Sequence, residues 1–340
     1  MILVDINEKD LDFNSFIFDS SYTIEDTESN KLINFESEMQ NRIIGQEHAI
    51  RSVVGAVKRS TFGLNIKEKP IGSYLFLGPT GVGKTETAKI LAETMFEDEE
   101  ALIRFDMSEY NDKYTISKLI GTTAGYVGYD QDGLLTQRIR ENPKSVVLFD
   151  EIEKADPRIM DLFLQVLDDG HLCDSKGQFV SFKETIIILT SNVGSKEIFD
   201  FIKSKTVLTD KLLDELKKKV LKKLTDRFRP EFLNRLDEII VYNPLDINAI
   251  SIILKNQLEE KKFLLEDKLN ISLEIDNNVI DFLVKKAFNI SFGARNVTRA
   301  LQSDFETPLI DCLLQYNDKH ILGMKVTATK NRLHFIPSFG

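Results

Sequence analysis

Apolar and polar positions follow one another along this chain in a pattern typical of alternating strands and helices. Between residues 43 and 243, short runs of almost wholly apolar residues are separated by longer polar or amphipathic stretches. These runs are 74–77, 102–105, 146–149, 186–189 and 239–241. Runs of this length are typical of strands buried on both faces, and their spacing predicts a parallel sheet flanked by helices. We therefore expect an α/β core with helices on both faces of the sheet.

Helical periodicity appears between these runs and dominates after them. Apolar residues recur every three or four positions after Pro157, and again over 212–224, which predicts two helices that each bury one face. Farther along, the pattern is helical through 250–265 and 279–287 and ends in a short strand near 333–336. The C-terminal part should therefore be mostly helical, with a short sheet at its end.

The chain is long enough, at 340 residues, for two domains. We expect a large domain over 41–243 and a small lid domain over 244–340. Residues 1–40 differ from both, because they hold ten acidic residues against two basic ones. Such a composition predicts an acidic lead-in that is partly disordered or docked on a partner.

A phosphate-binding loop follows the first apolar run. Residues 78–85 read GPTGVGKT, and the pattern stands between a buried strand and the helical stretch 86–93. The glycines let backbone N–H groups turn around phosphates, the lysine reaches the terminal phosphates, and the hydroxyl coordinates Mg²⁺. The chain should therefore bind a nucleoside triphosphate with Mg²⁺. The residues expected to bind it are Gly78, Pro79, Thr80, Gly81, Val82, Gly83, Lys84 and Thr85.

Two acidic residues, Asp150 and Glu151, end the apolar run 146–149. Open α/β sheets bind their ligands at the carboxyl ends of the strands, so these carboxylates should reach the nucleotide. Asp150 can hold the magnesium ion through the water shell of the ion, opposite Thr85, and Glu151 can polarise the attacking water. Phosphoryl transfer depends chiefly on positioning and charge stabilisation, so this pair predicts hydrolysis of the bound nucleotide.

Seven segments, in this order, resemble the second ATPase module of the Clp unfoldases of the ClpB, ClpC and ClpA kind. They are GPTGVGKT at 78–85, FDMSEY at 105–110, GYVGY at 125–129, LFDEIEK at 148–154, TSNVG at 190–194, FRPEFLNR at 228–235 and SFGAR at 291–295. The likeness runs from about Lys31 to beyond Leu301. It implies a P-loop AAA+ parallel-sheet core, a helical lid domain and ATP as the nucleotide.

Three residues outside the phosphate loop match nucleotide-sensing positions of AAA+ ATPases. Asn192 matches the polar sensor that helps to orient the attacking water, and Arg295 matches the second sensor in the lid. Arg235 matches the arginine finger, which reaches into the site of a neighbouring subunit and stabilises transition-state charge. With Glu151, these residues form the expected catalytic set, and the resemblance implies efficient hydrolysis only in a ring.

Two further segments resemble ligand contacts of the family. Ile43 and Ile44 resemble the segment that encloses the adenine, although a plain core role is a competing interpretation. Tyr126 and Val127 lie between two glycines and resemble the pore loop with which Clp rings grip a polypeptide. The expected substrates are unfolded or aggregated polypeptides, threaded through a central pore.

Departures from the family pattern affect the expected partners. The resemblance covers only the second module, so we expect a homo-hexamer, or a hetero-hexamer with a separately encoded first ATPase module. Between residues 194 and 229 there is no glycine-containing tripeptide of the kind that docks on the ClpP protease, which puts that docking in doubt.

Composition and charge narrow the function classes. The formal net charge of −10 argues against extensive binding of nucleic acid. The sequence shows neither a long apolar run nor the basic start of a signal peptide, so we expect no membrane contact and a soluble intracellular protein. The sequence is rich in Ile, Lys, Asn and Phe, which suggests an AT-rich genome. A protein of the plastid stroma or of the bacterial cytoplasm would fit this composition equally.

Two alternatives to an unfoldase stay open at this point. The first is an ATP-binding assembly or regulatory half-subunit, which completes a ring with a first module encoded elsewhere and remodels little by itself. The second is a nucleic-acid motor, because such motors share AAA+ signals. The acidic balance and the lack of a basic stripe interleaved with aromatic residues weigh against the second alternative.

Overall fold

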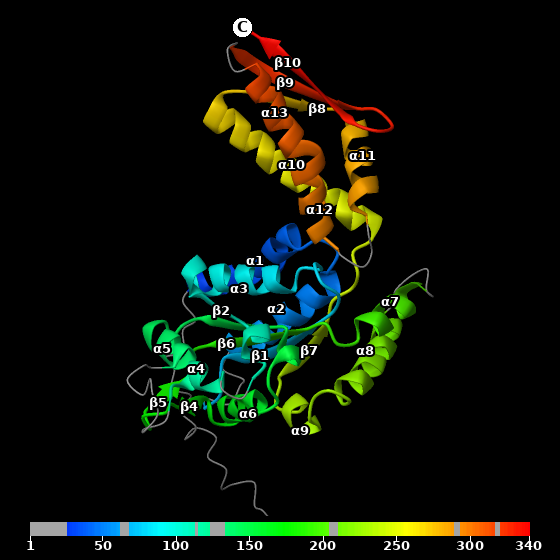
Figure 1. The fold of residues 1–340 in the computed structure, drawn as a ribbon. Helices are drawn as coiled ribbons and strands as arrows, with labels where there is room; N and C mark the ends of the chain where they lie inside the picture. The colour runs from blue at the N-terminus through cyan, green and yellow to red at the C-terminus, as the bar shows by residue number, and fades with distance from the viewer. Residues whose placement is uncertain are drawn as a thin grey trace, which may run out of the picture.

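A larger body built on a parallel sheet and a smaller body of helices with a second sheet make up the molecule (Figure 1). The chain passes from the first to the second between β7 (Glu238–Val241) and α10 (Ile247–Leu269). The domain boundaries expected from the sequence stay predictions. The structure is a computed structural model, and the residues it describes are 26–61, 68–112, 115–122, 133–203, 210–288, 293–316 and 320–340.

The sheet of the larger body has five strands, and all of their pairings are parallel. In spatial order they are β2 (Leu102–Asp106), β3 (Val146–Asp150), β6 (Ile186–Ser191), β1 (Gly72–Leu77) and β7. Every residue of β1, β3 and β6 is buried, which explains their unbroken apolar runs. The predicted parallel sheet is confirmed, and each of its strands contains one predicted run.

Helices cover both faces of this sheet, because alternate residues of each strand point to opposite sides. The helices are α1 (Asp26–Arg42), α2 (Glu47–Thr61), α3 (Lys84–Phe96), α4 (Ile116–Ile120), α5 (Leu134–Glu141), α6 (Ile159–Asp169), α7 (Ser195–Lys203), α8 (Asp210–Leu224) and α9 (Pro230–Leu233). Leu75, Val147 and Ile187 belong to one buried cluster with α5, α6, α7 and α8, whereas Tyr74 and Val146 belong to a second cluster with α1, α2 and α3. The predicted α/β class with helices on both faces is therefore confirmed.

Part of the acidic N-terminal segment is a helix packed on the larger body. Phe35 and Met39 of α1 are fully buried in the same cluster as α2 and α3. Arg42, at the end of α1, forms an ion pair with Glu93 of α3 over 2.5 Å. The acidic composition of this segment therefore coexists with an apolar stripe that holds α1 in place.

The smaller body has its own buried cluster. Leu254, Leu283, Phe305 and Val326 are among its most buried members, and they join the helices to a three-stranded sheet. Its further elements are β8 (Ser272–Ile275), α11 (Asn277–Ala287), α12 (Arg295–Ala300), the π-helical turn η5 (Leu301–Glu306), α13 (Thr307–Gln315), β9 (Ile321–Ala328) and β10 (Leu333–Phe339). The mostly helical lid with a short C-terminal sheet is confirmed. None of the described helices in either body offers the apolar length that a membrane crossing requires.

A short hairpin in the larger body was not predicted from the sequence. It consists of β4 (His171–Cys173) and β5 (Phe179–Ser181), which pair antiparallel between α6 and β6. Three residues per strand are too few for an alternating pattern to be recognised.

Candidate nucleotide-binding site

The phosphate-binding loop turns tightly between β1 and α3. Gly78, Gly81 and Gly83 have positive φ angles of 151°, 74° and 105°, which residues with a Cβ rarely adopt. A Cβ at Gly78 would also lie 2.7 Å from the carbonyl oxygen of Tyr242, just after β7. Glycine is therefore required here for the turn and for the close approach of the neighbouring backbone, and the loop delivers its N–H groups at the start of α3.

Lys84 is a buried cation at the first position of α3, with 8% of its surface exposed. Its ammonium donates to the carbonyl oxygen of Gly78, to that of Pro79 at 2.9 Å and to Oδ1 of Asn192 at 2.9 Å. Burial lowers the pKa of Lys84 to about 8, although nearby carboxylates act in the opposite direction. A buried ammonium held by neutral oxygens is well suited to receive an anion.

Asp150 and Glu151 lie at the carboxyl end of β3 and share one threonine. The hydroxyl of Thr190 donates to Oδ1 of Asp150 at 2.5 Å and accepts from the backbone N–H of Glu151 at 3.0 Å. The second carboxylate oxygen of Asp150 accepts from Arg104 at 2.6 Å, and Glu151 forms an ion pair with Lys154. Glu151 has a left-handed backbone, with φ of 57°, which is uncommon for a residue with a side chain and typical of functional sites.

Asn192 links the lysine to the acids. Its Oδ1 accepts from Lys84, and its Nδ2 lies 3.5 Å from Oε1 of Glu151. Its backbone N–H donates to Oε1 of Glu153 at 3.1 Å, and Oε2 of Glu153 is buried without a hydrogen-bond partner among the described residues. The expected sensor position is therefore next to both Lys84 and Glu151.

The smaller body contacts the phosphate loop directly. The backbone N–H of Ala294 donates to the carbonyl oxygen of Gly81 at 2.8 Å. Gly293 has a φ of 52°, and a Cβ there would lie 2.5 Å from the same carbonyl oxygen. Arg295 begins α12 immediately afterwards, so this contact brings its positive charge to the loop.

These groups line one cavity of about 300 Å³ at the edge of the sheet. Lys84, Arg104 and Arg295 supply positive charge there, and Asp150 and Glu151 supply carboxylates. The described residues contain no cluster of three His, Cys, Asp or Glu side chains that could hold a metal ion. Mg²⁺ usually takes only one or two ligands from carboxylates and the others from substrate phosphates and water. The donor set fits a triphosphate with Mg²⁺. The lining residues are Thr80, Gly81, Gly83, Lys84, Thr85, Glu86, Arg104, Asp150, Glu151, Thr190, Asn192, Ala294, Arg295 and Thr298.

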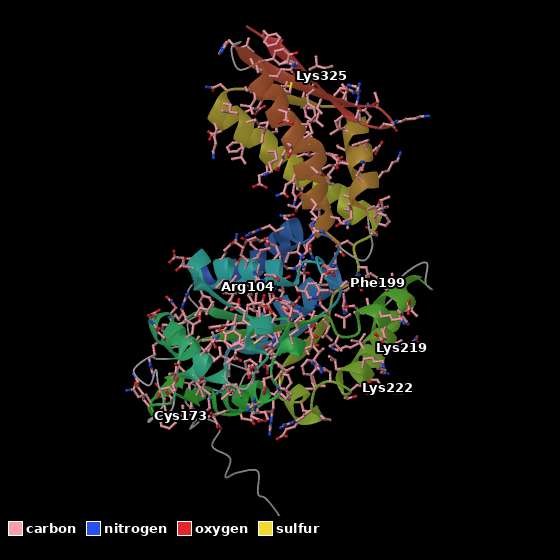
Figure 2. All side chains as sticks on the ribbon, viewed as in Figure 1. Arg104, Cys173, Phe199, Lys219, Lys222 and Lys325 are labelled. Carbon is pink, nitrogen blue, oxygen red and sulfur yellow. The ribbon has the colours of Figure 1, made fainter. Side chains whose placement is uncertain are left out.

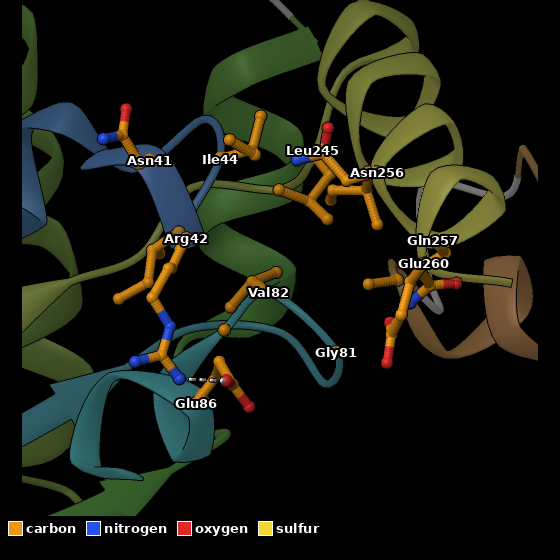
Figure 3. A pocket seen from close by; sticks show the side chains of 14 residues that line it. Asn41, Arg42, Ile44, Gly81, Val82, Glu86, Leu245, Asn256, Gln257 and Glu260 are labelled. Carbon is orange, nitrogen blue, oxygen red and sulfur yellow. Dashed lines mark ion pairs between the residues drawn. The ribbon is translucent and has the colours of Figure 1, made fainter. Parts of the chain in front are cut away.

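A second cavity of about 470 Å³ adjoins the first along the phosphate loop, between the two bodies (Figure 3). Ile44, Val82 and Leu245 give it apolar walls, while Asn256 of α10 adds a polar one. Ile43 also lines it, but is only 4% exposed and belongs to the core cluster behind it. An apolar cavity with a few polar groups, joined to an anion site, fits the base and sugar of a nucleotide.

Comparison with known proteins agrees with this geometry. Residues 69–239 match the family described as AAA domain (Cdc48 subfamily), which is half of the chain. The chain belongs to the AAA family. Residues 245–326 match the C-terminal, D2-small domain of ClpB protein, so the order of the two parts is that of the second Clp ATPase module.

The curated relatives of this AAA+ module include Clp chaperones and protease subunits. It is 48% identical to the chaperone protein ClpB of Meiothermus ruber, over 83% of this chain and 32% of that protein. It is 43% identical to the ATP-dependent Clp protease ATP-binding subunit ClpC of Staphylococcus aureus, over 92% of this chain and 38% of that protein. The chain thus spans about a third of the length of the curated relatives it matches.

A solved structure of Hsp104 with ATPγS and FITC casein, in its closed state, has a similar fold. The TM-score is 0.79 and the sequence identity 36%, over 92% of this chain and 53% of that chain. This confirms the AAA+ fold class, and the resemblance to the second Clp module is confirmed as well.

One expected catalytic residue, Arg235, is absent from the lining of both cavities, and the two expected pore-loop residues lie outside the part of the chain that the structure describes. Arg235 follows α9, and its Nε forms an ion pair with Asp168 of α6 over 3.0 Å, with the arginine side chain 44% exposed. It is absent from the lining of the nucleotide cavity within its own subunit. Tyr126 and Val127 lie outside the described residues, so their expected contact with a polypeptide stays a prediction.

Three residues at the site of the AAA+ module were not found from the sequence. Arg104 stands in a strand, where a charged residue normally indicates a solvent-facing position. Thr190 reads as the last residue of a buried run, and Glu153 as a polar residue of a turn. Arg104 and Thr190 reach Asp150 and Glu151 only across the sheet, which requires the strand order β2-β3-β6. Glu153 follows Glu151 closely in the sequence, and its place in the site depends on its contact with the backbone of Asn192.

Proposed function

We propose that this AAA+ module hydrolyses ATP with Mg²⁺ and uses the energy to remodel polypeptides within a ring. The observation that carries the proposal is the convergence of Lys84, Asp150, Glu151, Asn192 and Arg295 on one cavity. These groups come from both bodies, so the bound nucleotide would join the larger body to the lid. Such an arrangement couples nucleotide state to movement of one body against the other.

Each residue has a role that its surroundings support. Lys84 and the loop backbone would hold the phosphates, and Thr85 and Asp150 would hold Mg²⁺. Bound Mg²⁺ would supply neutralisation of phosphate charge. Glu151 would orient and polarise the attacking water, once its ion pair with Lys154 opens, and Asn192 would fix that carboxylate from the other side.

Arg235 would act in the nucleotide site of the next subunit. It lies outside the cavity of its own chain and is partly exposed, as a residue that works in trans must be. A guanidinium placed against a terminal phosphate contributes about 10³–10⁵ in rate in related phosphoryl-transfer enzymes. The module should therefore hydrolyse ATP efficiently only when assembled, as a homo-hexamer or together with another ATPase module.

The names of the relatives support a proposal for the substrate class. ClpB relatives are named chaperones, and the Hsp104 structure contains labelled casein. We infer that this module also acts on unfolded or aggregated polypeptides, with Tyr126 and Val127 as the gripping residues of a central pore. An aromatic side chain supplies contact area for many sequences, so this grip needs no particular substrate motif.

The experiment that tests hydrolysis compares Glu151→Gln and Arg235→Ala with the wild-type chain. Glu151→Gln should bind ATP normally and lose at least about 100-fold in turnover, because it loses the base but keeps the shape. Arg235→Ala should also bind ATP and lose turnover. Equal hydrolysis in wild type and Glu151→Gln would contradict the proposed role.

Mixing the two inactive variants tests action in trans. In a randomly mixed ring, about a quarter of the sites would combine an intact Glu151 with an intact Arg235 from the neighbour, so activity should partly return. No recovery in mixed rings of confirmed size would contradict the trans role. If the wild-type chain is an inactive monomer alone and gains activity only with a separate first module, the half-subunit alternative is correct instead.

A further inference from the structure

Arg104 is a positively charged residue of the nucleotide cavity, and none of the sequence motifs described above includes it. It lies in β2, in the part of the larger body nearer the lid (Figure 2), and its side chain is 50% exposed. Its Nη2 donates to Oδ2 of Asp150 over 2.6 Å, a short distance for a charge-assisted hydrogen bond. The guanidinium thus pairs with the carboxylate that is expected to hold Mg²⁺.

The two oxygens of Asp150 have partners of different kinds. Oδ1 accepts from the hydroxyl of Thr190, which is 1% exposed and also accepts from the backbone N–H of Glu151. That partner is fixed by packing. Arg104 is half-exposed on a flexible side chain, so it is the partner that can leave. A magnesium ion held by Asp150 would therefore compete with Arg104 for this carboxylate.

A guanidinium displaced from Asp150 needs another anion nearby. Asp106, at the end of the same strand, already accepts from the backbone N–H and the hydroxyl of Ser108, at 2.9 and 2.6 Å. Arg104 lines the same cavity as Lys84, where the phosphates would lie. Phosphate oxygens, like carboxylate oxygens, accept paired hydrogen bonds from arginine, so a phosphate beside Lys84 would be a suitable partner for Arg104.

We propose that Arg104 exchanges between Asp150 in the nucleotide-free protein and the terminal phosphate of ATP once Mg²⁺ occupies Asp150. It is thus a positioning residue for the metal and a determinant of the preference for ATP over ADP. This inference rests on the proposed function of the site as an ATP and Mg²⁺ site. It adds a residue of the same subunit to the cations around the terminal phosphate.

The first test measures the Mg²⁺ requirement of binding, with fluorescent mant-ADP as the probe. Arg104→Gln removes the competing cation, so the Mg²⁺ concentration that gives half-maximal enhancement of mant-ADP binding should fall about tenfold. An unchanged or higher Mg²⁺ requirement would overturn the proposed competition.

The second test compares nucleotides at saturating Mg²⁺. The ratio of the mant-ADP Kd to the mant-ATP Kd should fall about tenfold in Arg104→Gln, because only ATP offers the terminal phosphate. A ratio equal to that of the wild-type protein would mean that Arg104 merely orients Asp150, and the inference would be wrong.

Two further variants separate charge from packing and from a general loss of charge. Arg104→Lys keeps the charge and should retain most of the ATP preference; a loss as large as that of Arg104→Gln would contradict the inference. Arg104→Lys also keeps the test valid if Arg104→Gln does not fold.

Arg51→Gln is the control for a general loss of charge. Arg51 is exposed on α2, so the substitution changes the net charge as Arg104→Gln does and should change neither measurement. If the wild-type protein binds no mant-nucleotide, the proposed function itself fails, whereas normal binding without an Arg104 effect removes only this inference.

Discussion

Lys84 combines a buried position with a function that needs its charge. Burial lowers its pKa to about 8, so near that pH the nucleotide-free protein is a mixture of charged and neutral lysine. The triphosphate strongly favours the charged form, because it brings negative charge to an ammonium in a poorly solvated site. Binding of ATP should therefore raise the pKa of Lys84 back above 8.

This shift predicts proton uptake on binding. Near pH 8 the free lysine should be partly deprotonated and the nucleotide-bound lysine protonated, so ATP binding should take up a fraction of a proton. Above pH 8 the affinity should weaken by up to about tenfold per pH unit, because the free site must first acquire a proton. Calorimetric titrations in buffers of different ionisation enthalpy measure the uptake.

The matched control is Lys84→Arg. Arginine stays charged in this pH range, so any ATP binding it retains should show no such uptake. Binding of ATP to the wild-type protein at pH 8 without net proton exchange would contradict the prediction.

The β4–β5 hairpin connects two helices of the larger body, α4 and α5. Cys173 marks it in Figure 2, at the edge of the larger body away from the lid. The Asp174 side chain, 3% exposed, accepts from the backbone N–H groups of Lys176 and Gln178 and forms an ion pair with Arg140 of α5. The backbone N–H of Ser175 donates to the carbonyl oxygen at the end of α4, so the hairpin tip holds α4 and α5 together.

Asp174→Asn should therefore destabilise the larger body by about 1–3 kcal/mol. The amide oxygen can still accept from the two backbone N–H groups, but the buried ion pair with Arg140 is lost. Urea unfolding measures the change. The control is Asp161→Asn, which breaks an exposed ion pair with Arg229 and should cost less than about 1 kcal/mol. Equal losses in the two variants would show that the hairpin pair contributes no more than a surface pair.

The elements that could be predicted were those with a strong local signal. β1, β3 and β6 are buried on both faces, so their apolar runs are unbroken, and α6 carries a regular apolar face. β4, β5 and β8 each bury one residue, and a single buried residue gives no recognisable alternation of apolar and polar positions. β8 also depends on its pairing with β9, which lies much later in the chain.

The same limit applies to the site. Lys84, Asp150 and Glu151 were predicted because each stands in a motif next to a strand end. Arg104 and Thr190 act through contacts between neighbouring strands that are far apart in the sequence, and only the sheet register brings them to Asp150. The sequence alone fixes neither that register nor the strand order.

For the whole molecule, the contact between lid and phosphate loop at Gly293 should control nucleotide affinity. Gly293→Ala introduces a Cβ 2.5 Å from the carbonyl oxygen of Gly81, so the backbone of the lid or of the phosphate loop has to shift. We expect ATP affinity to fall about tenfold beyond the effect of the left-handed backbone itself, which costs about 1–2 kcal/mol for alanine. Fluorescent nucleotide titration gives the Kd.

Gly177→Ala is a suitable control, because Gly177 has a similar left-handed φ of 77° and open space where the Cβ would lie. It should lose stability without losing affinity. If both variants bind ATP as tightly as the wild-type protein, the lid contact does not support the nucleotide.

The hydrogen bond from Ala294 to Gly81 has a thermodynamic consequence for an assembly. Binding energies are reciprocal: if ATP favours one lid position by a given factor, any force that holds the lid in that position raises ATP affinity by the same factor. A neighbouring subunit that pushes or pulls on the lid would thus change the occupancy of a site it never touches. In a ring, mechanical load on one lid would then set the order in which successive sites fill and empty.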